Sequence, residues 1–125
     1  HFGFIDETLN HDLVDIAAYY AGALFLVAVS DGQLIGTGAL IHEADGVARV
    51  VRMSADRRYR RMGIGRAILA CLLDHARSLS YRRVVLETND DWDDAIAFYK
   101  ASGFRETARG FGEVAFSLDL QTPST

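Results

Sequence analysis

The chain has 125 residues, half of them apolar, with a formal net charge of −4 and a single cysteine, Cys71. This length supports one domain around one core, which we expect residues 1–125 to form, and the composition excludes disordered and fibrous classes. The acidic balance argues against nucleic acid as a partner, and the absence of a long apolar run argues against a membrane. A lone cysteine cannot form an intrachain disulfide, so we expect a cytoplasmic protein.

The first predicted element is a helix over residues 10–22 ("NHDLVDIAAYYAG"), with Asn10 as its N-cap and Gly22 at its end. Two strands are predicted next, over 23–30 and 33–41. The dipeptide Asp31-Gly32 between them favours a tight hairpin turn. A third strand, 47–55, would complete an antiparallel meander.

The second half of the chain alternates helices and strands. The spacing predicts a helix over 66–79, a strand over 82–88, a helix over 93–102 and a strand over 113–120. Because a helix joins strand 47–55 to strand 82–88, these two strands should be parallel. The order of elements therefore predicts an α/β domain, a mixed and mostly antiparallel sheet flanked by helices.

A glycine-containing segment, "RRMGIG" (60–65), lies where strand 47–55 leads into helix 66–79. Gly63 and Gly65 lack side chains, so N–H groups at the helix start can converge on one anion. Seven of the thirteen basic residues lie between Arg49 and Arg66, which adds positive charge here. The spacing fits neither a Walker loop nor a dinucleotide fingerprint, and alone it also suits a glycine turn beneath solvated arginines.

Two segments resemble the motifs of one family, the GNAT N-acetyltransferases. The stretch "MSADRRYRRMGIGRAIL" (53–69) is similar to its motif A, and "DDAIAFYKASGF" (93–104) to its A-x-x-x-Y-x-x-x-G-F helix. The matched positions are Arg60, Gly63 and Gly65 in the first segment and Ala95, Tyr99, Gly103 and Phe104 in the second. The resemblance covers about residues 23–120.

This resemblance implies the GNAT acyl-CoA N-acyltransferase fold, in which a splayed parallel strand pair holds acetyl-CoA. The pyrophosphate would rest on the N–H groups of residues 61–66, and the pantetheine arm would pair with the main chain of Met53 and Ala55. Phe98 and Tyr99 would close the cleft from the second helix. The implied cofactor-binding residues are Met53, Ala55, Arg60, Arg61, Met62, Gly63, Ile64, Gly65, Arg66, Phe98 and Tyr99. No metal is expected.

The implied reaction is acetyl transfer to a primary amine by direct attack in a ternary complex. Tyr99 matches the family's position for the general acid that protonates the leaving thiolate, so Cys71 is not needed as a nucleophile. The acceptor stays open between small molecules and proteins, as does a homodimer. The alternative is a noncatalytic CoA-binding module that senses the ligand or contacts a partner.

The sequence departs from the family's pattern at two positions. Arg49 lies where many relatives carry a glutamate, which leaves the general base unassigned among Glu87, His42, Glu43 and a water chain. Trp92 replaces an asparagine that contacts the cofactor arm. It could pack on the pantetheine, line the acceptor pocket or cap the core.

The chain begins with His1 rather than Met. Family members usually start with a strand before their first helix, and the segment "HFGFI" (1–5) is a candidate remnant of it. We therefore expect natural sequence upstream of His1.

Overall fold

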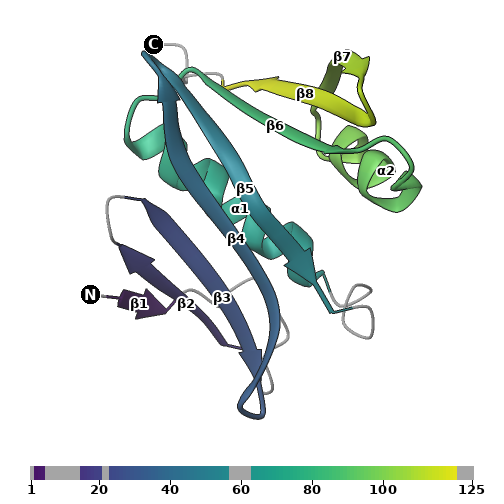
Figure 1. The fold of residues 1–125 in the computed structure, drawn as a ribbon. Coiled ribbons are helices and arrows are strands. Elements are labelled where there is room, and N and C mark those ends of the chain that lie inside the picture. Colours follow the sequence, from purple (N-terminus) through teal and green to yellow (C-terminus); the bar gives the residue numbers. More distant parts are fainter. Residues whose placement is uncertain (1, 5–14, 21–22, 57–62, 121–125) are drawn as a thin grey trace.

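The computed structural model describes residues 2–4, 15–20, 23–56 and 63–120, which form an eight-stranded sheet and two helices (Figure 1). The strands follow the spatial order β1-β2-β3-β4-β5-β6-β8-β7. The strands are β1 (Phe2–Phe4), β2 (Asp15–Tyr20), β3 (Leu24–Ser30), β4 (Gln33–Ala44), β5 (Val47–Ala55), β6 (Arg83–Asn89), β7 (Arg105–Gly110) and β8 (Glu113–Asp119), and the helices are α1 (Ile64–Ser78) and α2 (Asp93–Ala101).

The predicted meander is confirmed as β3, β4 and β5, each antiparallel to the next. At the β3–β4 turn, Asp31 and Gly32 both have positive φ, 51° and 78°. This is the combination that a two-residue hairpin turn requires, and it explains why the Asp-Gly dipeptide could be recognised from sequence.

The predicted parallel pair is confirmed as β5 and β6, but the two strands pair over a short length only. The register joins Val47 to Arg83, and Arg49 to Val85 is the last pair. Beyond it β6 pairs with β8 alone, and Figure 1 shows β5 and β6 diverging from this point. At the closed end, the Gly46 carbonyl accepts hydrogen bonds from the N–H groups of Arg82 and Arg83, at 2.8 and 3.1 Å.

Helix α1 lies against the central strands and supplies much of the core. A Cβ at Gly36 would stand 2.7 Å from Ile64 Cγ2, and one at Gly38 2.6 Å from Ile68 Cγ2. Both distances are too short for a carbon atom, so the two glycines allow α1 to approach β4 closely. The buried residues of α1 are Ile64, Ala67, Ile68, Leu69, Leu72, Leu73 and Ala76.

The helix predicted over 10–22 is wrong where the structure describes it, since Asp15–Tyr20 is strand β2. Residues 10–14 and 21–22 lie outside the described residues. Strand β2 pairs with β1 on one edge and β3 on the other, which satisfies its backbone groups. Its isoleucine and tyrosines suit a strand, and its two alanines fit either structure, so helical spacing was a weak guide.

Strand β7 was missed, and its sequence explains why. All six residues from Arg105 to Gly110 are exposed, so the strand has no alternation of apolar and polar residues. It pairs with β8 through a turn at Phe111 and Gly112, whose φ values are 56° and 81°. The remaining elements match their predictions to within two or three residues at each end.

Candidate active site

The glycines of the segment 60–65 lie at the start of helix α1, and no side chain caps this helix start among the described residues. Helix α1 begins after Gly63, whose φ of 81° is the left-handed conformation that favours glycine. Within the described residues, no side chain caps the first turn, and it contains no acid. The N–H groups of Ile64, Gly65 and Arg66 have no acceptor inside the helix. This end of α1 is thus suited to an anion.

The predicted phosphate-binding residues are described in part. Arg60, Arg61 and Met62 lie outside the described residues. Ile64 is fully buried and anchors the turn in the core, whereas Arg66 is exposed.

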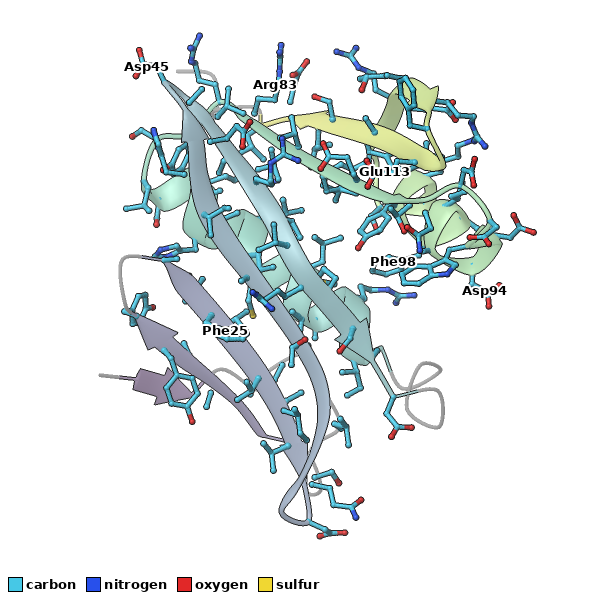
Figure 2. The ribbon with its side chains drawn as sticks, viewed as in Figure 1. Phe25, Asp45, Arg83, Asp94, Phe98 and Glu113 are labelled. Carbon is cyan, nitrogen blue, oxygen red and sulfur yellow. The ribbon has the colours of Figure 1, made fainter. Side chains whose placement is uncertain are left out.

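Phe98 of α2 lies over the same turn. A Cβ built at Gly65 would stand 3.6 Å from Phe98 Cζ, an ordinary contact distance. Figure 2 shows the Phe98 ring projecting from α2. The structure therefore brings Gly65 and Phe98 together, although they come from separate sequence motifs.

A cavity of about 250 Å³ lies between β5 and β6 where they diverge. We call it the cleft. Its walls come from β5, β6, α2 and the start of β8. The lining residues are Val50, Val51, Arg52, Met53, Leu86, Glu87, Thr88, Asn89, Trp92, Ala95, Tyr99 and Glu113.

The two sides of the cleft differ in chemistry. Val50, Leu86 and Tyr99 are buried and belong to the core that α1 shares. Glu87 follows Leu86 and is exposed, because successive strand residues point to opposite faces. Glu113, at the start of β8 (Figure 2), is likewise exposed next to buried Val114. The cleft thus has an apolar wall on the helix side and acidic groups on the other.

Strand β5 is bulged within the cleft. Thr37 pairs with Ser54 and Ala39 with Val51, so Arg52 and Met53 together oppose Gly38. Arg52 takes a φ of 59°, which is uncommon for a residue other than glycine. The Thr37 hydroxyl donates a hydrogen bond of 2.6 Å to the Arg52 carbonyl and holds this conformation.

The predicted pantetheine contacts, Met53 and Ala55, lie on β5 past its last pair with β6. Both are half-buried. The edge of β5 that faces the cleft has no strand partner there among the described strands. This edge can accept an extended ligand as an additional strand would be accepted.

Tyr99 packs in an aromatic cluster at the cleft wall. Its ring centroid lies 5.1 Å from that of Phe98 and 5.9 Å from those of Phe104 and Phe116. The residue is only 7% exposed, and this burial raises the pKa of Tyr99 to about 12. Among the described residues its hydroxyl has no hydrogen-bond partner, so it is a protonated donor available to a ligand in the cleft.

Arg49 is ion-paired on both sides, with Glu43 of β4 and Glu87 of β6. Its Nε and Nη2 bond the Glu43 carboxylate at 2.7 and 3.1 Å, and its Nη1 bonds Glu87. The hydrogen bond from Arg49 lowers the pKa of Glu43, and both carboxylates raise the pKa of Arg49. Of the three candidate bases, Glu87 alone lines the cleft. Glu43 does not, and His42 Nδ1 lies 2.8 Å from the Tyr81 hydroxyl at a separate cavity.

Trp92 lines the cleft and is 56% exposed, immediately before α2. A tryptophan that caps the core would be buried, so this exposure leaves the ring available to a ligand. Cys71 is half-buried on α1 and does not line the cleft.

Sequence reasoning missed Arg52, Asn89 and Glu113 as cleft residues. Arg52 could have been singled out as a charge within the apolar run "VARVVRMSA". Asn89 is the last residue of β6 and Glu113 the first of β8, and no spacing rule joins them to either motif.

The described residues contain no group of three or more His, Cys, Asp and Glu side chains arranged to hold a metal ion. Neither helix that the structure describes has the length and apolar character needed to cross a bilayer.

Comparison with known proteins agrees with this geometry. The family model described as "Acetyltransferase (GNAT) family" matches residues 3–104. N-acetylaspartate synthetase of Rattus norvegicus is 37% identical over 106 residues, covering 82% of this chain and 36% of that protein. Human N-acetyltransferase 8B is 32% identical over 128 residues, covering 95% of this chain and 56% of that protein.

Among solved structures, the PaiA N-acetyltransferase of Thermoplasma acidophilum in complex with coenzyme A has a TM-score of 0.73. It is 21% identical and covers 79% of this chain and 62% of its own, and the likeness shows the fold alone. The chain thus spans 36% and 56% of the two curated relatives. The match over residues 3–104 shows that the chain belongs to the GNAT acetyltransferase family.

Proposed function

We propose that the chain is an acetyl-CoA-dependent N-acetyltransferase that transfers an acetyl group to a primary amine. The observation that carries the proposal is the placement of Tyr99. Tyr99 lines a cleft between diverging parallel strands, and its hydroxyl has no hydrogen-bond partner among the described residues. An uncapped helix start lies near the same cleft, at Gly65 beside Phe98.

The residues present fit acetyl-CoA. Residues 61–66 would hold the pyrophosphate on main-chain N–H groups, with Arg60, Arg61 and Arg66 supplying positive charge. The main chain of Met53 and Ala55 would pair with the pantetheine arm. Phe98 and Tyr99 would border that arm on the helix side. When bound, acetyl-CoA supplies an activated acetyl group as a thioester.

The proposed chemistry needs no acyl-enzyme. The amine nitrogen bonds to the thioester carbonyl carbon, and the C–S bond breaks. Tyr99 donates its phenolic proton to the departing thiolate and regains a proton from solvent. The amine loses one proton through water, and Glu87 is the one of the three candidate bases that lines the cleft.

The names of relatives suggest which acceptors to test first. N-acetylaspartate synthetase is named for an amino acid acetylated on its amine, so amino acids head the panel. Polyamines and lysine-containing peptides complete it.

The test is release of CoA thiol from acetyl-CoA in the presence of each acceptor, with mass spectrometry of the product. We expect acetylation of at least one amine, at a rate that falls by about 10²-fold or more in Tyr99→Phe. Tight CoA binding without transfer to any acceptor would favour a noncatalytic CoA-binding module instead.

A further inference from the structure

Arg52 is a positive charge on the cleft wall that no described residue neutralises. It lines the cleft and is exposed. Its guanidinium has no ion-pair or hydrogen-bond partner in the described part of the chain, although its own carbonyl is bonded by Thr37. Arg49, three residues earlier, differs because two glutamates neutralise it.

The backbone at Arg52 is held in a costly conformation. A φ of 59° at a residue with a side chain costs on the order of 1 kcal/mol, and such strain is concentrated at functional sites. A bulge beside an active site redirects the side chain that it carries. Thr37 Oγ1 bonds the Arg52 carbonyl and also lies 3.1 Å from Ser54 Oγ, so a polar cluster maintains the bulge.

The opposite wall of the cleft carries the contrary charge. Glu113 of β8 is exposed there and has no cationic partner among the described residues, whereas Glu87 of β6 is paired with Arg49. A ligand that carries both an amine and an anion would find a complementary group for each end. A ligand with amines alone would leave Arg52 unpaired and facing a like charge.

The position of Arg52 argues against a role in binding the pyrophosphate. Arg52 lies between Val51 and Met53 of β5, and all three residues line the cleft. The uncapped helix start, where the pyrophosphate is proposed to bind, comes later in the chain, at residues 64–66. A strand advances by about 3.3 Å per residue, and three residues of β5 follow Arg52, so its Cα lies about 10 Å before the end of the strand. Arg52 lines the same cavity as Tyr99, the proposed acid, and so borders the reacting end of the cleft.

We propose that Arg52 determines acceptor specificity by binding a carboxylate carried next to the acceptor amine, so that the acceptors are amine-bearing carboxylic acids of the amino acid class. This inference rests on the proposed acetyl transfer. The guanidinium would bind the carboxylate through two parallel hydrogen bonds and so orient the amine toward the thioester. Arg52 takes no part in the bond changes.

The test compares each L-amino acid with its α-amide and its decarboxylated amine, in wild type, Arg52→Gln and Arg52→Lys. We expect the wild type to prefer the acids. Arg52→Gln should lower kcat/KM for the acids by about 10- to 100-fold and leave the amides nearly unchanged, because the lost contact is a charged hydrogen bond. Arg52→Lys should restore part of the loss. KM for acetyl-CoA should stay constant. Arg77→Gln, an exposed arginine of α1 paired with Asp74, is the matched control.

Three outcomes would overturn the inference. Equal use of acids and amides, or an equal loss for both in Arg52→Gln, would remove Arg52 from acceptor recognition. A raised KM for acetyl-CoA instead would assign Arg52 to the cofactor.

If no acceptor turns over, the proposed transfer fails separately, and titration of the CoA-saturated protein with the same acids and amides decides the inference. Selective binding of the acids that is lost in Arg52→Gln would support it, and its absence would refute it.

Discussion

Arg49 and Val85 form the last cross-strand pair between the parallel strands β5 and β6. Every cleft residue on β5 follows Arg49, and every one on β6 follows Val85. The Arg49 side chain also bonds Glu87, two residues beyond that pair. The point where backbone pairing ends is thus also held by an ion pair.

Gly65→Glu should abolish the rise in melting temperature that CoA or acetyl-CoA causes. The new carboxylate would stand at the uncapped start of α1, where the pyrophosphate is proposed to bind, and a ligand that no longer binds cannot stabilise the native state. Thermal denaturation with and without 1 mM ligand checks this.

Two controls accompany that variant. Gly65→Ala should retain a shift, because its Cβ makes only an ordinary 3.6 Å contact with Phe98. Gly110→Glu adds the same charge at an exposed glycine of β7 with no atom within 4 Å of its Cβ, and should leave the shift intact. An unchanged shift in Gly65→Glu would refute the proposed site.

Gly38→Ala should destabilise the fold by about 1–3 kcal/mol, the range for an overpacked core. The new methyl group would lie 2.6 Å from Ile68 Cγ2 and 2.7 Å from Met53 Sδ, so α1 or the bulge must shift. Urea denaturation measures the effect. Gly110→Ala, at an open position, should change stability by less than about 0.5 kcal/mol. Similar urea midpoints for the two variants would mean that the packing of α1 against β4 does not require a glycine at position 38.

The stabilisation that Arg49 provides through Glu43 should depend on pH. The pKa of Glu43 lies below its ordinary value of 4.5 in the folded protein, mainly because Arg49 bonds its carboxylate. A depressed carboxyl pKa gives stability that is present above the unfolded pKa and lost as pH falls through the folded one.

Melting temperatures of wild type and Arg49→Gln between pH 3 and 7 check this dependence. The two proteins should differ at pH 6–7 and converge toward pH 3. A difference that is constant over this range would assign the effect of Arg49 to packing alone.

The elements that sequence predicted correctly depend on local signals. Asp31-Gly32 marks its turn because both residues need a positive φ there, and only a few residue types adopt a positive φ readily. Gly63 and Gly65 mark the start of α1, and the spacing of residues 93–104 places Tyr99 on a helix that faces the core. These local features also carry the family motifs, so the family could be identified before the fold was known.

The features that sequence did not predict depend on contacts between distant segments. The bulge at Arg52 arises from the register of β4 against β5, since Thr37 and Ala39 fix which residues oppose Gly38. No local pattern encodes that register. Strand β2 likewise depends on its pairing with β1 and β3, which overrides the weak helical spacing of residues 10–22.

Tyr99→Phe should lower turnover on the best acceptor by about 10²-fold or more, the range for losing a general acid. The variant keeps the ring that packs against Phe98, Phe104 and Phe116, so CoA affinity and stability should change little. Because burial raises the pKa of Tyr99 to about 12, the wild-type hydroxyl stays protonated at every assay pH below 10. The ratio of wild-type to variant rates should therefore be constant between pH 6 and 10.

The control for this prediction is Tyr81→Phe, which removes a hydroxyl that bonds His42 and does not line the cleft. It should leave turnover unchanged. Single-turnover kinetics must show that acetyl transfer limits the rate, since slow product release could mask the loss of a proton donor. Under that condition, equal rates in wild type and Tyr99→Phe would exclude Tyr99 as the acid and leave solvent to protonate the thiolate. A ratio of wild-type to variant rates that falls as pH rises from 6 to 10 would mean that Tyr99 ionises in the bound state. The bound ligand would then lower the pKa of Tyr99 and offset the effect of burial.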